Sequence, residues 1–95
     1  MKFKPDTGDT EIAEIFFKLS SLTEGLHGAH GFTGGRSRSP EQIERGYLYA
    51  FVVDFDGWPD LKAYADHPEH QTLSSQIIDC AIGGMDGIIM LDLEV

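Results

Sequence analysis

Apolar residues recur at helical spacing in the first third of the chain. They form one stripe made of Ile12, Ile15, Phe16, Leu19 and Leu22. A stripe with this period predicts an amphipathic helix that packs one face against a core, and Gly25 is a typical helix end. Phe17 lies well off the centre of the stripe. We expect its ring to bury elsewhere, to face a cavity or to stay exposed.

The clearest strand signal runs over residues 47–55, where nearly every residue is apolar. Tyr47, Tyr49, Phe51, Val53 and Phe55 alternate with Leu48, Ala50 and Val52, so the two sets lie on opposite faces of the strand. A sheet with one wet face alternates apolar with polar residues, and this strand does not. We therefore expect helices to cover one face and a partner sheet to cover the other.

Weaker patterns complete the order of elements. They predict a strand end at Met1–Lys4, a strand over 26–33, a polar connection over 34–45, a short helix over 61–65, a helix from Pro68 to about Ile82, and a last strand over 88–95. The order strand–helix–strand–strand–helix–strand is typical of an α+β, ferredoxin-like fold. The expected protomer is an antiparallel four-stranded sheet with helices on one face.

The length and net charge of the chain limit the classes of partner that it can bind. A chain of 95 residues forms one domain with a small core, and self-association often compensates for this. The net charge of −9 disfavours nucleic acids and anionic membranes, which require clustered Lys and Arg. The only basic cluster, Arg36 and Arg38 with Arg45 nearby, is interpreted as a solvated loop or as a local anion contact.

Cys80 is the only cysteine, which excludes an intrachain disulfide and a four-cysteine zinc site. We expect an inert, buried thiol at this position, with a reactive thiol as the alternative. The first residues lack an apolar run of the signal-peptide type, and no apolar stretch is long enough to cross a membrane. A cytoplasmic location is therefore expected.

The candidate chemistry lies at the corner His67-Pro68-Glu69-His70, shortly after Tyr64. His70 has the pKa range of a general base, and Tyr64 could hold a substrate carbonyl or an enolate. The alternative is structural: Tyr64 packs under the corner and His70 bonds a backbone carbonyl. His67 precedes Pro68, a residue suited to the first turn of a helix, so we interpret His67 mainly as a helix cap.

Other candidates are weaker. Tyr49 and Phe51 share one strand face and either pack in a core or dimer interface or line an apolar pocket, to which Phe17 and His67 are also assigned. His27 and His30 repeat the spacing of His67 and His70, but residues three apart on a strand face opposite sides. We therefore predict no metal site, and no cofactor.

Taken together, these motifs resemble the stress-responsive A/B barrel domain (Dabb) family over nearly the whole chain. The matching segments are Phe3-Lys4-Pro5, Phe16-Phe17, Gly46-Tyr47, Phe55-Asp56-Gly57, Leu61, Tyr64, His67-Pro68-Glu69-His70 and Leu91-Asp92-Leu93. The resemblance implies a ferredoxin-like protomer and a homodimer in which two four-stranded sheets pack through their faces into an α+β barrel. The family usually begins with a full strand, whereas this chain begins almost at the first matching segment.

The resemblance also frames the possible functions. Many members have no established activity, which implies a binding or stress-protective role, with a small hydrophobic molecule as the possible ligand. One plant member, olivetolic acid cyclase, uses a tyrosine and the second histidine of the corner, which correspond to Tyr64 and His70; a histidine of its pocket corresponds to Tyr49. The alternatives are a cofactor-free cyclase, isomerase or lyase acting on a small hydrophobic carbonyl compound, and a monooxygenase of the related dimeric barrel type.

Overall fold

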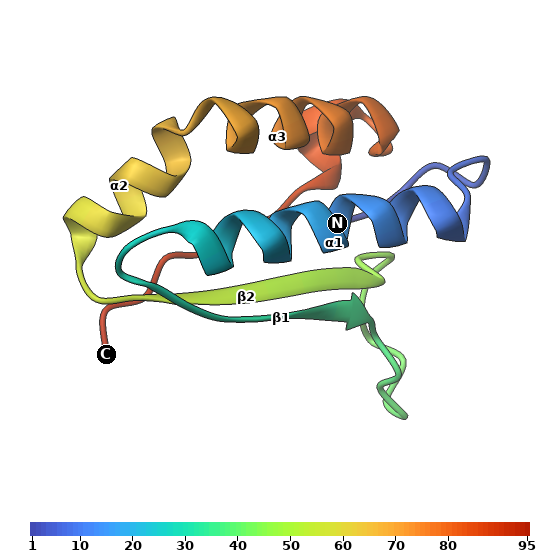
Figure 1. Ribbon diagram of the computed structural model, residues 1–95. Coiled ribbons are helices and arrows are strands. Elements are labelled where there is room, and N and C mark those ends of the chain that lie inside the picture. Colours follow the sequence, from blue (N-terminus) through green and yellow to red (C-terminus); the bar gives the residue numbers. More distant parts are fainter.

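A computed structural model describes residues 1–95 and places three helices on one face of a two-stranded antiparallel sheet (Figure 1). The elements in chain order are α1 (Asp9–Gly25), β1 (Ala29–Arg36), β2 (Tyr49–Phe55), α2 (Trp58–Asp66), α3 (Pro68–Cys80) and a short 3-10 helix, η1 (Gly84–Gly87). The predicted helices and the two central strands are confirmed, with shifted ends. None of the helices has the length and apolar character needed to cross a membrane.

The two strands form an irregular hairpin. Pairing runs from Ala29 opposite Phe55 to Arg36 opposite Tyr49, with a shift in register between His30 and Thr33. The polar connection between the strands spans residues 37–48, and the first strand begins three residues later than residue 26, where it was predicted to begin. This irregular register lies beside the start of α2 and leaves β1 as an edge of the sheet.

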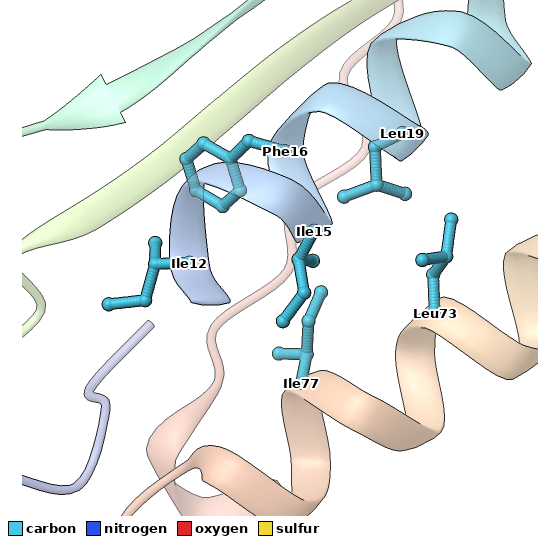
Figure 2. Close-up of a cluster of buried hydrophobic side chains, with 6 residues drawn as sticks. All are labelled: Ile12, Ile15, Phe16, Leu19, Leu73 and Ile77. Carbon is cyan, nitrogen blue, oxygen red and sulfur yellow. The ribbon is translucent and has the colours of Figure 1, made fainter. Parts of the chain in front are cut away.

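The core lies between the sheet and the helices. Figure 2 shows its central cluster, in which α1 packs against α3; the members are Ile12, Ile15, Phe16, Leu19, Leu73 and Ile77. The predicted apolar stripe of α1 is therefore confirmed as a core face. Tyr49 and Phe51 extend the core to the sheet, with ring centroids 6.4 Å and 5.9 Å from that of Phe16. Only 12 of the 95 residues are buried, so the core of one protomer is small.

The first residues occupy the place beside β2. The α-ammonium group of Met1 donates to the carbonyl oxygen of Tyr49 at 2.7 Å, and the Tyr49 amide donates back to the Met1 carbonyl at 3.4 Å. On the side of these first residues that faces away from β2, the Lys2 amide donates to the Gly87 carbonyl at 2.8 Å, and the Ile82 amide donates to the Lys2 carbonyl at 2.9 Å. Residues 1–2 therefore lie between β2 and the end of the chain, as a strand of the sheet would.

Residues 88–95, for which a last strand was predicted, are extended but form no strand. The segment starts beside Lys2, near the Tyr49 end of β2, and Glu94 accepts a hydrogen bond from Nε1 of Trp58, near the other end, at 3.0 Å. It thus runs alongside β2, one strand position away. The backbone groups of a strand need hydrogen-bond partners on a neighbouring strand. Only Met1 and Lys2 lie in the strand position between β2 and residues 88–95. The sheet observed here consequently has two strands rather than four.

The sheet face opposite the helices is bare (Figure 1). Ile88 packs against the core, whereas the apolar residues that follow it in the tail, Ile89, Met90, Leu91 and Leu93, are all at least 60% exposed. Val52 of β2 is 62% exposed, and Leu91 and Leu93 are 78% and 79% exposed. The face that was predicted to meet a partner sheet is therefore apolar and uncovered.

Candidate functional site

The corner between α2 and α3 brings Tyr64 and His70 together. His67 lies between the two helices, and its Nδ1 accepts a hydrogen bond from the Glu69 amide at 3.1 Å, so its predicted role as a helix cap is confirmed. The chain bends between α2 and α3, and the rings of Tyr64 and His70 lie with their centroids 4.2 Å apart. Tyr64 and His70 are six residues apart in the sequence, so they can act together only because the chain bends at this corner.

Tyr64 is buried, with 6% of its surface exposed, and it packs on Phe55 at a centroid distance of 5.2 Å. Its hydroxyl group is buried and has no hydrogen-bond partner. Burial raises the pKa of Tyr64 to about 12, because the phenolate would lose its hydration. The side chain therefore stays neutral near pH 7 and keeps an unused proton that it can donate.

His70 is half-buried and held at both ring nitrogens. Its Nδ1 lies 3.2 Å from the carbonyl oxygen of Ala65, and its Nε2 lies 3.5 Å from Oγ of Ser74. A carbonyl only accepts hydrogen bonds, so Nδ1 carries the proton and the lone pair of Nε2 faces the Ser74 hydroxyl. Burial lowers the pKa of His70, and the nearby His67 lowers it further, against the raising effect of the Ala65 carbonyl. The neutral ring can accept a proton through Nε2.

An open groove lies elsewhere, between α1 and β1, with a volume of about 910 Å³. We call it the α1–β1 groove. Its lining residues are Asp9, Ile12, Ala13, Phe16, Phe17, Ser20, Phe32, Thr33, Gly34, Gly35, Arg36, Arg38 and Tyr49. A smaller cavity of about 240 Å³ near Phe3 and Leu48 shares some of these residues. Neither cavity is lined by Tyr64 or His70.

The groove combines aromatic walls with two guanidinium groups. Arg36 lies over the ring of Tyr49, with Cζ 5.8 Å from the centroid. The ion pairs of the molecule are His30 with Asp56 and Lys62 with Asp66, so neither Arg36 nor Arg38 has an acidic partner. Each of these arginines can therefore contact an anion without first breaking an ion pair.

The structure divides the predicted pocket residues. Phe17 and Tyr49 both line the α1–β1 groove, and Phe17 is 73% exposed. Phe51 stacks on Phe32 with ring centroids 5.3 Å apart but does not line the groove, and His67 lies at the helix corner. Sequence reasoning did not assign Phe32, Arg36 or Arg38 to a pocket. The signal for the arginines was their unusual clustering in an acidic chain.

The remaining candidates form no cluster. His30 bonds Asp56 through Nε2 at 2.8 Å, and His27 is exposed. No group of three or more His, Cys, Asp or Glu side chains is arranged to hold a metal ion. Cys80, predicted to be buried, is partly exposed instead, and its thiol donates to a carboxylate oxygen of Glu11 at 3.3 Å. Desolvation, and then the neighbouring Glu11, raise the pKa of Cys80, which disfavours the reactive thiolate.

Solved structures share this fold. A dimeric ferredoxin-like protein of unknown function from Jannaschia sp. CCS1 superposes with a TM-score of 0.92 at 33% identity, covering 100% of this chain and 92% of that one. The protein At3g17210 from Arabidopsis thaliana superposes with a TM-score of 0.72 at 22% identity, covering 82% of this chain and 76% of that one. At that identity the second likeness concerns the fold alone.

Sequence comparisons agree with the fold. The stress-response A/B barrel domain-containing protein At5g22580 from Arabidopsis thaliana is 27% identical over 96 residues, covering 100% of this chain and 80% of that protein. Residues 1–95, the whole chain, match the Stress responsive A/B Barrel Domain, Dabb. The resemblance inferred from the motifs is thereby confirmed, and the chain belongs to the stress-responsive A/B barrel domain family.

Proposed function

We propose that this protein is a homodimeric binding protein without catalytic turnover, whose α1–β1 groove takes a small hydrophobic ligand. The observation that carries the binding role is the groove itself. Its volume of about 910 Å³ lies within the range of small-molecule sites, and aromatic residues wall it. Phe17 lines the groove with most of its side chain exposed, and it does not belong to the buried core.

The bare sheet face supports the dimer. Val52, Ile89, Leu91 and Leu93 are all at least 60% exposed, and so many exposed large apolar side chains in a small domain favour an interface. The small core of one protomer gives a second reason for association. The relative from Jannaschia is described as dimeric. The four-stranded sheet belongs to the same proposal, with residues 1–4 and 88–95 as its two additional strands.

Sedimentation of two matched variants tests the dimer. Val52→Lys places a charge on the bare face, whereas Ile43→Lys places the same charge on the connection between the strands, at a side chain that is 60% exposed. We expect the wild type and Ile43→Lys to sediment as dimers of the 10.5 kDa chain at ~10 μM, and Val52→Lys as a monomer. A wild type that stays monomeric at this concentration would overturn the dimer.

Titration with Nile red, a neutral apolar dye, tests the groove. We expect saturable binding by the wild type and by Ile43→Ser, and clearly weaker binding by Phe17→Ser. Because Phe17 is exposed, its substitution leaves the core intact, and circular dichroism checks this. Unsaturable binding by the wild type, or equal binding by Phe17→Ser, would contradict the groove as the ligand site.

A second candidate function is a cofactor-free cyclase, isomerase or lyase that acts on a small hydrophobic carbonyl compound. The buried Tyr64 hydroxyl favours it, because this unpaired donor lies beside a neutral histidine whose unprotonated Nε2 has the Ser74 hydroxyl as its partner, at 3.5 Å. In such a reaction the phenol would hold the carbonyl oxygen and His70 would accept the proton. Turnover of a β-keto substrate that is lost in both Tyr64→Phe and His70→Gln would favour the enzyme over the binding protein.

A further inference from the structure

We propose that the ligand of the α1–β1 groove is an amphipathic carboxylate, with its apolar body on the aromatic wall and its carboxylate between Arg36 and Arg38. This inference rests on the groove-binding role proposed above and adds the chemistry of the ligand. The groove brings an exposed apolar ring, that of Phe17, and two guanidinium groups into one cavity.

The distribution of charge carries the first step. The chain holds 16 acidic residues against 7 basic ones, yet two of those 7 line a single cavity. Asp9 is the only acidic residue in the lining, and it forms no ion pair with either arginine. Glu44 is also near Arg36. The hydrogen bond that its carboxylate accepts from the Ser37 hydroxyl at 2.6 Å lowers the pKa of Glu44, and the charge of Arg36 contributes to lowering it, but the carboxylate forms no ion pair with the arginine. Both guanidinium groups of the groove therefore remain without an ion-pair partner in the protomer.

The apolar wall carries the second step. Phe16 and Phe32 meet edge to face, with centroids 6.3 Å apart, and Phe17 flanks them on α1. Gly34 permits this close approach, because a Cβ at its position would lie 2.8 Å from Cβ of Phe51 and 3.2 Å from the Phe16 ring. Arg36 lies two residues after Gly34 on β1, so its side chain leaves the strand on the same face as the aromatic wall.

The aromatic wall and the two arginines together indicate the chemical class of the ligand. A guanidinium group presents two parallel N–H donors that match the two oxygens of a carboxylate. A purely apolar ligand would leave the arginines unused, and a small hydrophilic anion would leave the aromatic wall unused. An anionic membrane surface is disfavoured as the source of the negative charge, because the whole chain carries a net charge of −9. A soluble carboxylate with an alkyl or aryl body satisfies both surfaces.

Competition against bound Nile red tests the inference, with decanoate and decan-1-ol as probes of equal chain length. We expect decanoate to compete about tenfold more tightly than decan-1-ol near pH 7, an advantage that falls as salt screens the arginines. Arg36→Gln and Arg38→Gln should each weaken decanoate severalfold, and weaken decan-1-ol and Nile red much less, so that the preference for decanoate over decan-1-ol shrinks. Arg45→Gln, a basic residue outside the groove, should change none of them.

The outcomes separate the two proposals. If Nile red does not bind saturably, the groove-binding role itself fails. If Nile red binds and decanoate competes no better than decan-1-ol, the binding role stands and the carboxylate is wrong. If Arg45→Gln weakens decanoate as much as Arg36→Gln does, the preference reflects diffuse charge and the assignment to the groove is overturned. A groove filled by a second copy would show as Nile red binding that falls with protein concentration, which also overturns it.

Discussion

Replacing Tyr64 by phenylalanine removes one oxygen atom that is buried and has no hydrogen-bond partner. The ring keeps its packing on Phe55 and His70, so the substitution leaves at most a void of the size of one oxygen atom. A buried hydroxyl without a partner costs about 1–3 kcal/mol relative to its hydrated state. We therefore expect Tyr64→Phe to raise the free energy of unfolding by about 1 kcal/mol or more. For a domain of this size, that corresponds to a rise in Tm of about 4–8 °C per kcal/mol.

Alkaline pH enlarges the difference between the two proteins. The pKa of Tyr64 is about 12 in the folded chain, against 10.0 for an unperturbed phenol. The unfolded chain thus loses this proton first, so the stability of the wild type falls as the pH rises from about 10 towards 12, by up to roughly 3 kcal/mol from this one group. Tyr64→Phe lacks the group. We expect its advantage over the wild type to grow across this range of pH.

Urea unfolding at fixed protein concentration, followed by the fluorescence of Trp58, measures both effects. Tyr47→Phe is the matched control, because its hydroxyl is exposed and donates to the Asp86 carbonyl at 3.3 Å. We expect this control to change stability by no more than about 0.5 kcal/mol. A Tyr64→Phe variant that is less stable than the wild type near pH 7 would show that the hydroxyl has a stabilising partner, and would refute the reasoning from its burial.

Three further unfolding experiments test other parts of the structure. Burial lowers the pKa of His70, so the unfolded chain takes up a proton first as the pH falls through about 6.5, and the free energy of unfolding falls with the pH. His70→Gln should reduce this loss of stability at acid pH, whereas substitution of the exposed His27 by glutamine should not. Gly28→Ala should destabilise by about 2 kcal/mol or more, because its φ is +77° and a Cβ would lie 2.4 Å from Cγ of Asp60. Leu19→Ala should cost about 2–5 kcal/mol, because Leu19 is 1% exposed in the core. An unchanged urea midpoint in either of the last two variants would contradict the packing described.

The sequence predicted those parts of the fold that local patterns determine. The apolar stripe from Ile12 to Leu22 faces the core, and the alternating residues of β2 turn Tyr49 and Phe51 towards α1. The helix predicted over 61–65 starts three residues earlier in the structure, at Trp58, and includes Pro59 in its first turn. Proline lacks an amide proton, which a first helical turn does not need, so the helix includes it without a lost hydrogen bond.

Contacts between distant segments could not be predicted in this way. Residues 88–95 alternate as a strand does, but their pairing depends on which backbone lies beside them, and only Met1 and Lys2 are there. The α1–β1 groove likewise depends on how α1 crosses β1, and no local pattern near Phe32 or Arg36 encodes that crossing. For Tyr64 the sequence indicated a close approach to His70 but not the unpaired state of its hydroxyl, which is a property of the whole packed corner.

The corner and the groove lie at opposite ends of β2, and this separation decides how the two candidate functions can be tested. Tyr64 packs on Phe55, the last residue of the strand, whereas Arg36 lies over Tyr49, the first. Six residue steps along a strand span about 20 Å, which separates the Tyr64 end of the strand from the basic end of the groove. Tyr64 is absent from the lining of the groove, so a ligand held there does not contact the Tyr64 hydroxyl. Tyr64→Phe should leave decanoate and Nile red binding unchanged, and a loss of either in that variant would mean that the two sites are one.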